Sequence, residues 1–454
     1  MNSVRCVLDL KTPPGVYADR PSLVRNSAWA HQEGYDLVAR KLPLASNFQS
    51  AGLEAVALSE ATDITADRAQ KLAVTVGMEV IIDEGKITVP YPINTPGDPE
   101  FYRLVATDPH QMICLESSVT PEALANLGLT PWQIKGWIGT ARLIDLWAPF
   151  GHGQRGLIVS PPKVGKTTIL RVIGFGVAQM GIPVIYILVF ERPEEVTRIL
   201  KTANYPGVEI YASTFDEAAI KAVNVAELAL ERAKRLVEAG KSVLVLVDSI
   251  TKLGRAYNGL VADRPREQQG SITKGGIFRG TALYPGTIDL LKRFFGAGRA
   301  TDRSPGLGMV GSMLLTKDPF DSDIWQEMKG TGNWDIYLAE VLAGAGIYPA
   351  VNLNQSSTRE DHLLLGERHP LVAAFRRSNR GITTGDLLQL ISQTASNQEL
   401  LETWGNQGGK GKRRSGSNQP KPEHPNSVPV EDGDVDAAIR KLGWNQRKPN
   451  GRGG

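Results

Sequence analysis

A lysine and a threonine stand side by side in the stretch SPPKVGKTTIL, residues 160–170, between an apolar run and a helical pattern. The phosphates of a nucleotide bind where a helix begins, because unpaired backbone N–H groups and the helix dipole favour an anion there. Lys166 is placed to reach the β- and γ-phosphates, and Thr167 is placed to hold Mg²⁺, as in a P-loop. The usual pattern begins with glycine, and Ser160 replaces it here, so the stretch predicts nucleotide binding by an unusual loop.

Two acidic residues follow strand-like apolar runs further along the chain. Asp248 ends the run SVLVLVD about 80 residues after the loop, which is where a second acid steers Mg²⁺ in P-loop enzymes. Glu191 ends the run PVIYILVFE, and a carboxylate there is predicted to polarise the water that attacks the γ-phosphate. An acid at either position also has a structural interpretation as a helix cap, which Glu194 and Glu195 fit better as first-turn acids.

Strand-like and helical patterns alternate over residues 135–404, and this alternation predicts an α/β fold. Continuous apolar runs are typical of strands buried on both faces, so we expect a mainly parallel sheet with helices on both sides. The helical patterns are TTILRVIGFGVAQM and EAAIKAVNVAELALERAKRLVEAG, and the strand-like runs are RGLIVS, PVIYILVF, VEIYAST, SVLVLVDS and GMVGSMLLT.

Residues 1–130 are predicted to form a separate small α+β module. The segment ADRAQKLAV predicts a helix, and MEVIID and KITVPY predict a hairpin around the turn DEGK. The module holds 10 Lys/Arg and 16 Asp/Glu, a net charge of −6, which disfavours a groove for phosphates. Its aromatic residues are scattered, so no strand of interleaved aromatic and basic residues is predicted.

Residues 405–454 are rich in glycine, proline, serine and charge, a composition that predicts a disordered basic tail. The tail holds 10 Lys/Arg and 5 Asp/Glu, and residues 435–444 predict one short helix within it. Tethered cations would raise the local concentration of RNA without reading its sequence. A solubilising tail would have the same composition, so both interpretations stay open.

The composition of the 454 residues bounds the class of protein. No apolar run is long enough to span a membrane, and the N-terminal residues lack the apolar stretch of a signal peptide. The two cysteines, Cys6 and Cys114, form neither a disulfide framework nor a metal-binding spacing. A cytoplasmic protein with no membrane partner is the expectation.

Several motifs together resemble the ATPase core of transcription termination factor Rho. The resemblance covers about residues 135–400, and the Rho loop is itself a Pro-Pro-Lys loop without the leading glycine. F1-type and flagellar-export ATPases share the RecA-like core, but they carry a glycine-rich loop instead. The matching runs, in order, are TARLIDLWAPFGHGQRGLIVSPPKVGKTTIL, FERPEEVT, ASTFDEAA, AKRLVEAGKSVLVLVDSITKLGRAYN, LKRFFGAGR, MKGTGN and NQSSTRE.

The resemblance implies a homohexameric ring that hydrolyses ATP with Mg²⁺ while single-stranded RNA occupies its pore. It assigns Glu191 as the catalytic base, Thr167 and Asp248 as the metal site, and Arg359 as an arginine finger that reaches the neighbouring subunit. The other implied nucleotide contacts are the loop residues Pro162, Lys163, Val164, Gly165 and Lys166, the site-lining Arg192 and Arg255, and Thr168 and Tyr348, which flank the adenine.

The sequence departs from the Rho pattern at the two loops that line the pore. In the first, residues 258–276, Ser271 stands where the family has a lysine, and Thr273 and Lys274 are the nearby candidates for RNA contact. In the second, Pro319 stands at the lysine position and leaves Lys317 as the nearby cation. Each lost phosphate contact would be repeated around a ring, so we expect ATP hydrolysis to be preserved and RNA translocation to be altered.

A second group of departures lies near the nucleotide. Phe190 stands before the catalytic acid where the family usually has aspartate, and Gly344 and Gly346 stand where basic residues precede the adenine aromatic. These glycines remove charged side chains that would help to couple subunits.

The prediction from these residues is an RNA-dependent, ATP-hydrolysing ring motor that acts in transcription termination. Two alternatives stay open. One is a Rho-like ATPase that acts on another polymer or regulates a standard Rho, and the other is a nucleotide-gated RNA-binding scaffold with little helicase activity. RNA polymerase and a standard Rho are the candidate protein partners.

Overall fold

The computed structural model describes residues 101–406, apart from residue 204 and residues 263–282, together with the backbone of five strands between residues 4 and 88. The predicted tail helix, the helix predicted before the N-terminal hairpin, and the pore residues Ser271, Thr273 and Lys274 lie outside the described residues.

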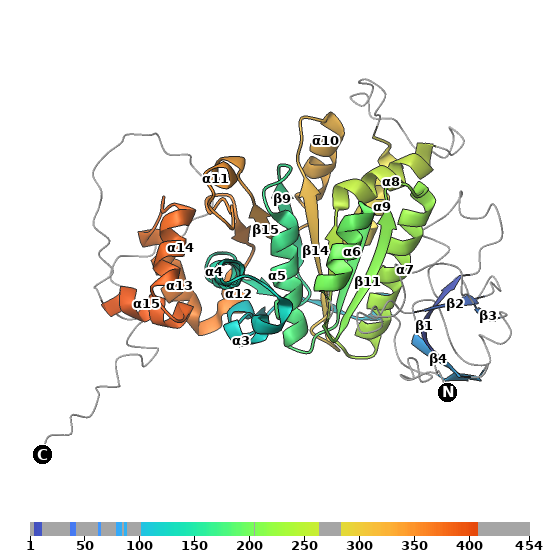
Figure 1. Ribbon diagram of the computed structural model, residues 1–454, viewed down its shortest axis with the longest axis horizontal. Coiled ribbons are helices and arrows are strands. Elements are labelled where there is room, and N and C mark those ends of the chain that lie inside the picture. Colours follow the sequence, from blue (N-terminus) through green and yellow to red (C-terminus); the bar gives the residue numbers. More distant parts are fainter. Residues whose placement is uncertain are drawn as a thin grey trace, which may run out of the picture.

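A seven-stranded, mainly parallel sheet forms the centre of the ATPase region (Figure 1). The five strands predicted from apolar runs are all present, so the predicted α/β, RecA-like core is confirmed. Only the edge strand β16 runs antiparallel to its neighbour. The strands lie in the order β11 (Val208–Thr214), β10 (Val184–Glu191), β12 (Val243–Asp248), β14 (Leu307–Leu314), β9 (Arg155–Ser160), β15 (Trp334–Tyr337) and β16 (Ser357–Thr358).

Alternate residues of each central strand enter two different cores, because successive side chains of a strand point to opposite faces. Ile185 and Ile187 of β10 pack in one core, whereas Tyr186 and Leu188 pack in the other. The first core is covered by α7 (Ala219–Glu238), α8 (Ile250–Ala262), α9 (Pro285–Phe295) and α10 (Pro319–Met328), and the second by α4 (Pro131–Trp147), α5 (Lys166–Gln179) and α6 (Pro193–Thr202).

The C-terminal helices lie beside α4, at the end of the molecule away from α7 to α9 (Figure 1). Arg142 of α4 joins the two parts, because its buried guanidinium donates hydrogen bonds to the backbone oxygens of Ile391 at 2.6 Å and Thr394 at 2.5 Å. None of the described helices combines the length and the apolar character needed to cross a membrane. These C-terminal helices are α11 (Glu340–Gly344), α12 (Asp361–Leu365), α13 (His369–Ser378), α14 (Thr384–Ser392) and α15 (Asn397–Asn406).

The segment before α4 packs into the same body as the sheet. Phe101 is fully buried in the first core, and its backbone N–H donates to Glu238 of α7 at 2.7 Å. Asp145 of α4 accepts the N–H groups of Leu115 and Glu116. The boundary predicted at residue 130 therefore falls inside a packed unit that begins by residue 101. Its short elements are η2 (Phe101–Arg103), β6 (Ala106–Thr107), β7 (Met112–Ile113), η3 (Leu115–Ser117), α3 (Pro121–Leu124), η4 (Ala125–Leu127), β8 (Phe150–Gly151), β13 (Ala300–Thr301) and η6 (Gly366–Arg368).

The backbone described between residues 4 and 88 forms a separate five-stranded antiparallel sheet. The predicted hairpin is present as β4 and β5, and the other three strands were not predicted. The sheet order is β3 (Thr62–Ile64), β2 (Leu37–Lys41), β1 (Val4–Leu10), β4 (Glu79–Asp83) and β5 (Lys86–Thr88).

A substitution at Gly174 of α5 would test how closely this helix packs on the sheet. A Cβ at Gly174 would lie 2.3 Å from the Tyr186 hydroxyl oxygen and 2.8 Å from Leu246 Cδ1, so Gly174→Ala should lower the free energy of unfolding by about 1–3 kcal/mol. Gly136→Ala is the matched control, because nothing lies within 4 Å of its Cβ position and alanine favours a helix by about 0.5–1 kcal/mol. Urea unfolding measures both, and a Gly174→Ala protein as stable as the parent would contradict the described packing.

Candidate nucleotide-binding site

The phosphate-binding loop joins the end of β9 to the start of α5. Ser160 ends the strand and is fully buried, and Gly165 precedes the helix with a φ of 95°, which favours glycine. Lys163 has a φ of 63° and is exposed with Pro162 at the tip of the loop, whereas Val164 is buried. The helix runs for 14 residues, so its N-terminus offers the dipole and backbone donors of an anion site.

Asp248, Lys166 and Thr167 meet at the carboxyl end of the sheet. Asp248 accepts hydrogen bonds from Lys166 Nζ at 2.5 Å, from Thr167 Oγ1 at 3.0 Å and from Ser312 Oγ at 2.7 Å. Burial opposes both charges, but their mutual attraction outweighs it, so the pKa of Asp248 is lowered and the pKa of Lys166 is raised. Both groups are therefore charged at neutral pH. Ser312 was missed because the sequence does not reveal that β14 lies between β9 and β12.

The same residues fit a magnesium site. Thr167 Oγ1 and a carboxylate oxygen of Asp248 are hard oxygen donors 3.0 Å apart, and Mg²⁺ in nucleotide sites takes one or two protein oxygens besides water and phosphates. The Thr167 hydroxyl would ligate the ion and Asp248 would orient its water.

Glu191 is the last residue of β10, so it lies at the same carboxyl end of the sheet as Asp248. The pairing of β10 with β11 shifts register between Leu188 and Glu191, and Phe190 adopts a φ of 49° there. A bulge re-aims the side chain that follows it, and a bulky residue at positive φ costs roughly 1–3 kcal/mol. The backbone N–H of Phe190 donates to Ser213 Oγ at 3.1 Å, which holds this conformation. The bulge therefore sets the direction of the predicted catalytic acid.

Glu191 is buried and forms an ion pair with Lys252 of α8. Burial, followed by the charge of Asp248, raises the pKa of Glu191 to about 7, although Lys252 lowers it. A carboxylate with a pKa near the working pH suits a general base. Lys252 was not predicted as a site residue, although it stands four residues after Asp248 and so lies about one helical turn beyond the strand end.

Arg255 of α8 pairs with two acids at the start of α10. Its guanidinium pairs with Asp321 at 2.5 Å and with Asp318 at 2.8 Å, and it lies over the Phe320 ring. Its site-lining role stays a prediction, and Lys252 is the cation of α8 that contacts Glu191. The two acids that pair with Arg255 flank Pro319 in the stretch predicted to form the second pore loop, and Lys317 is exposed in the segment between β14 and α10.

Arg359 lies at the amino-terminal end of the parallel strands, whereas the phosphate loop lies at their carboxyl end. It follows β16, which pairs with Trp334 and Asp335 at the start of β15, and its backbone N–H donates to Asn333 at 3.0 Å. The phosphate loop follows the other end of β9, five residues or about 16 Å further along the strand direction. The exposed Arg359 side chain is therefore directed to solvent at an edge remote from its own site.

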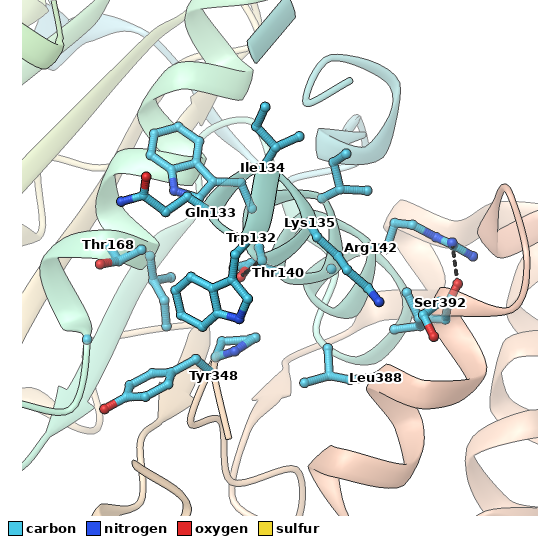
Figure 2. Close-up of a pocket in the computed structure, with 18 of the residues that line it drawn as sticks. Trp132, Gln133, Ile134, Lys135, Thr140, Arg142, Thr168, Tyr348, Leu388 and Ser392 are labelled. Carbon is cyan, nitrogen blue, oxygen red and sulfur yellow. Dashed lines mark hydrogen bonds between the residues drawn. The ribbon is translucent and has the colours of Figure 1, made fainter. Parts of the chain in front are cut away.

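Tyr348 and Thr168 lie at the side of the loop, where the resemblance places the adenine. A Cβ built on Gly165 would lie 3.7 Å from the Tyr348 ring, and Tyr348 is 41% exposed. Figure 2 shows both side chains on the wall of a cavity that also contains Trp132. Arg192 is exposed at the start of α6.

The pKa of Glu191 predicts a pH dependence for any reaction in which it acts as a base. The ionised form is active, so turnover should rise between about pH 6 and about pH 8 with a midpoint near the folded pKa. Lys252→Met removes a cation that favours ionisation, so it should move this midpoint upward by about one pH unit or more. The exposed Lys201 is the control, and its change to Met should leave the midpoint unaltered. A downward shift in Lys252→Met would contradict the assigned contact. The measurement is kcat as a function of pH.

The loop between β9 and α5, with acids at the ends of β10 and β12, places this protein in the class of RecA-like P-loop nucleotide-binding proteins. Residues 140–358 match the ATP synthase alpha/beta family, nucleotide-binding domain. The chain is 40% identical over 311 residues to transcription termination factor Rho of Mycobacterium leprae, covering 67% of this chain and 46% of that one. Over its ATPase region the chain is therefore similar to proteins of the Rho family.

Other relatives give a similar picture. The Rho proteins of Thermotoga maritima and Allochromatium vinosum are each 43% identical, over 58% and 50% of this chain and 61% and 52% of their own lengths. The chain thus spans about half the length of the curated relatives it matches. A solved structure of a prototypical ATPase from a type III secretion system matches 67% of this chain and 82% of its own, with a TM-score of 0.46 and 21% identity.

Proposed function

We propose that this chain hydrolyses ATP as a subunit of a homohexameric ring that moves on single-stranded RNA in transcription termination. The observation that carries the proposal is the meeting of Glu191 and Lys252 with the Asp248, Lys166 and Thr167 cluster at one edge of the sheet. The relatives are named transcription termination factors, which supports a role in termination. The match to a nucleotide-binding domain supports the binding of ATP.

The side chains divide the work of hydrolysis between binding and proton transfer. Lys166, which is paired with Asp248, turns to the β- and γ-phosphates when the nucleotide enters. Bound Mg²⁺ supplies neutralisation of the charge on those phosphates. Glu191 accepts a proton from the attacking water as its oxygen bonds to the γ-phosphorus and the bond from that phosphorus to the ADP oxygen breaks. The products are ADP and inorganic phosphate.

The position of Arg359 favours a ring. An exposed arginine at the end of the sheet remote from its own phosphate loop could enter the site of a second copy in a head-to-tail arrangement, which forms a ring when the rotation between subunits closes. Charge developing on the γ-phosphate is then stabilised in trans.

Two features bear on RNA. The N-terminal backbone has five antiparallel strands, which is the strand number of an OB-fold, a barrel that binds oligonucleotides. In the second pore loop Lys317 is exposed, whereas Pro319 is the first residue of α10 and carries no charge. This loss favours a second candidate function, regulation of a standard Rho through mixed rings, over a robust helicase.

The test is the steady-state ATPase rate of the full chain with and without RNA. We expect poly(C) to raise kcat by about tenfold or more, with less stimulation as salt increases, because phosphate contacts release counterions. Single-stranded DNA and other RNA homopolymers measure the preference for the polymer. Equal rates with every polymer and with none would reject the RNA-dependent motor and leave the ATPase. Removing residues 405–454 should weaken RNA binding and its salt dependence if the basic tail contributes.

A further inference from the structure

A cavity of about 810 Å³ lies beside the phosphate loop, between α4, α5, α14 and residues 346–350. Gly165 and Thr168 line it, so it opens directly onto the nucleotide site. Its volume lies within the range of sites that bind small molecules. Much of its wall is apolar, including Leu388 and Ile391 of α14. The cavity is therefore continuous with the place where the phosphates of a nucleotide would bind.

Trp132 and Tyr348, which are far apart in the sequence, both line this cavity (Figure 2). Trp132 is 69% exposed and Tyr348 is 41% exposed, although large aromatic side chains are usually well buried. Exposed aromatic faces at a binding site supply stacking area for a planar ligand. Tyr348 already lies against Gly165, so a purine attached to phosphates at the loop would meet its ring first.

The position of Trp132 is well defined although its side chain is exposed. It is the second residue of α4, after Pro131, and the helix begins with a capping box in which Thr130 and Gln133 bond each other's backbone N–H groups. The hydrogen bonds of Arg142 to the α14 end hold the same helix against the far wall of the cavity. An aromatic on such a rigid element loses little conformational freedom when it binds a ligand.

We propose that Trp132 is a base-binding residue, forming with Tyr348 an aromatic clamp for the purine of the bound nucleotide. Thr168, which flanks the base on the other side in the predicted arrangement, is short and exposes only a methyl and a hydroxyl group. Trp132 completes the apolar surface that Thr168 leaves open. The inference rests on the proposed binding of ATP at the loop and goes beyond it by naming a residue that recognises the base.

The experiment compares ATP with inorganic tripolyphosphate, which carries phosphates without a base. Calorimetric titration in the presence of Mg²⁺ should show that Trp132→Ala raises the Kd for ATP by about tenfold, because a base stacked on an aromatic loses that contact. The Kd for tripolyphosphate should stay within about twofold, and Trp132→Phe should restore most of the ATP affinity. Val105→Ala, which shortens a 62% exposed side chain outside the cavity, is the matched control.

Each other outcome overturns the clamp. An unchanged Kd for ATP in Trp132→Ala would show that the indole does not touch the base. Equal weakening of ATP and tripolyphosphate would show that Trp132 acts through the folding of α4, and a change in ring assembly alone, measured by sedimentation, would assign it to a subunit contact. The binding results for the Trp132 variants decide the clamp. Absence of RNA stimulation in the parent protein would reject only the proposed RNA motor.

Discussion

The Glu191→Gln protein is expected to lose steady-state ATP hydrolysis by about 10²–10⁴-fold while it retains ATP binding within about twofold. Glutamine keeps the size of the side chain and its hydrogen bond to Lys252, but it cannot accept a proton from water. The register shift before Glu191 directs the carboxyl group without needing its charge, so the site should remain folded. Phosphate release measures turnover, and calorimetry measures binding.

Glu194→Gln is the matched control for this change. Glu194 is an exposed first-turn acid of α6, three residues after Glu191, and its neutralisation should alter turnover by less than about twofold. If Glu191→Gln and Glu194→Gln retained similar rates, Glu191 would not be the base. If Glu191→Gln instead lost ATP binding, the acid would be structural.

The kcat of the Arg359→Ala protein should be about 10³–10⁵-fold lower than that of the parent, which is the effect of removing an arginine finger. Its stability should barely change, because the side chain is exposed. Arg377→Ala, an exposed arginine of α13, should keep parental turnover and so controls for loss of a surface charge.

Mixing two inactive proteins tests whether Arg359 acts on a neighbouring subunit. In a mixed ring, an Arg359→Ala subunit supplies an intact Glu191, and its Glu191→Gln neighbour supplies an intact Arg359. About a quarter of the interfaces in an equal mixture would have this pairing, since each position is filled at random. Partial recovery of turnover is therefore expected. Mixed rings that form and stay inactive would contradict action in trans.

The fold was predictable where the local pattern carries the signal. Runs such as SVLVLVDS are apolar throughout because both faces of a central strand are buried, and the strands formed where those runs lie. The short strands β15 and β16 were not predicted, because two to four residues at a sheet edge have no periodic pattern. The sequence did not show that Phe101 and Leu115 pack with the sheet domain, because each is buried by helices that follow later in the chain.

The candidate site divides in the same way. By itself the sequence determined the chemistry of the loop and the two acids. Asp248 and Glu191 end strands, Lys166 and Thr167 begin the helix that follows a third strand, and parallel strands end on one side of a sheet. Their partners were decided only by the tertiary structure. Lys252 meets Glu191, and Trp132 and Tyr348 line the same cavity, because these arrangements depend on helix packing and on the order of strands, which local residue patterns do not encode.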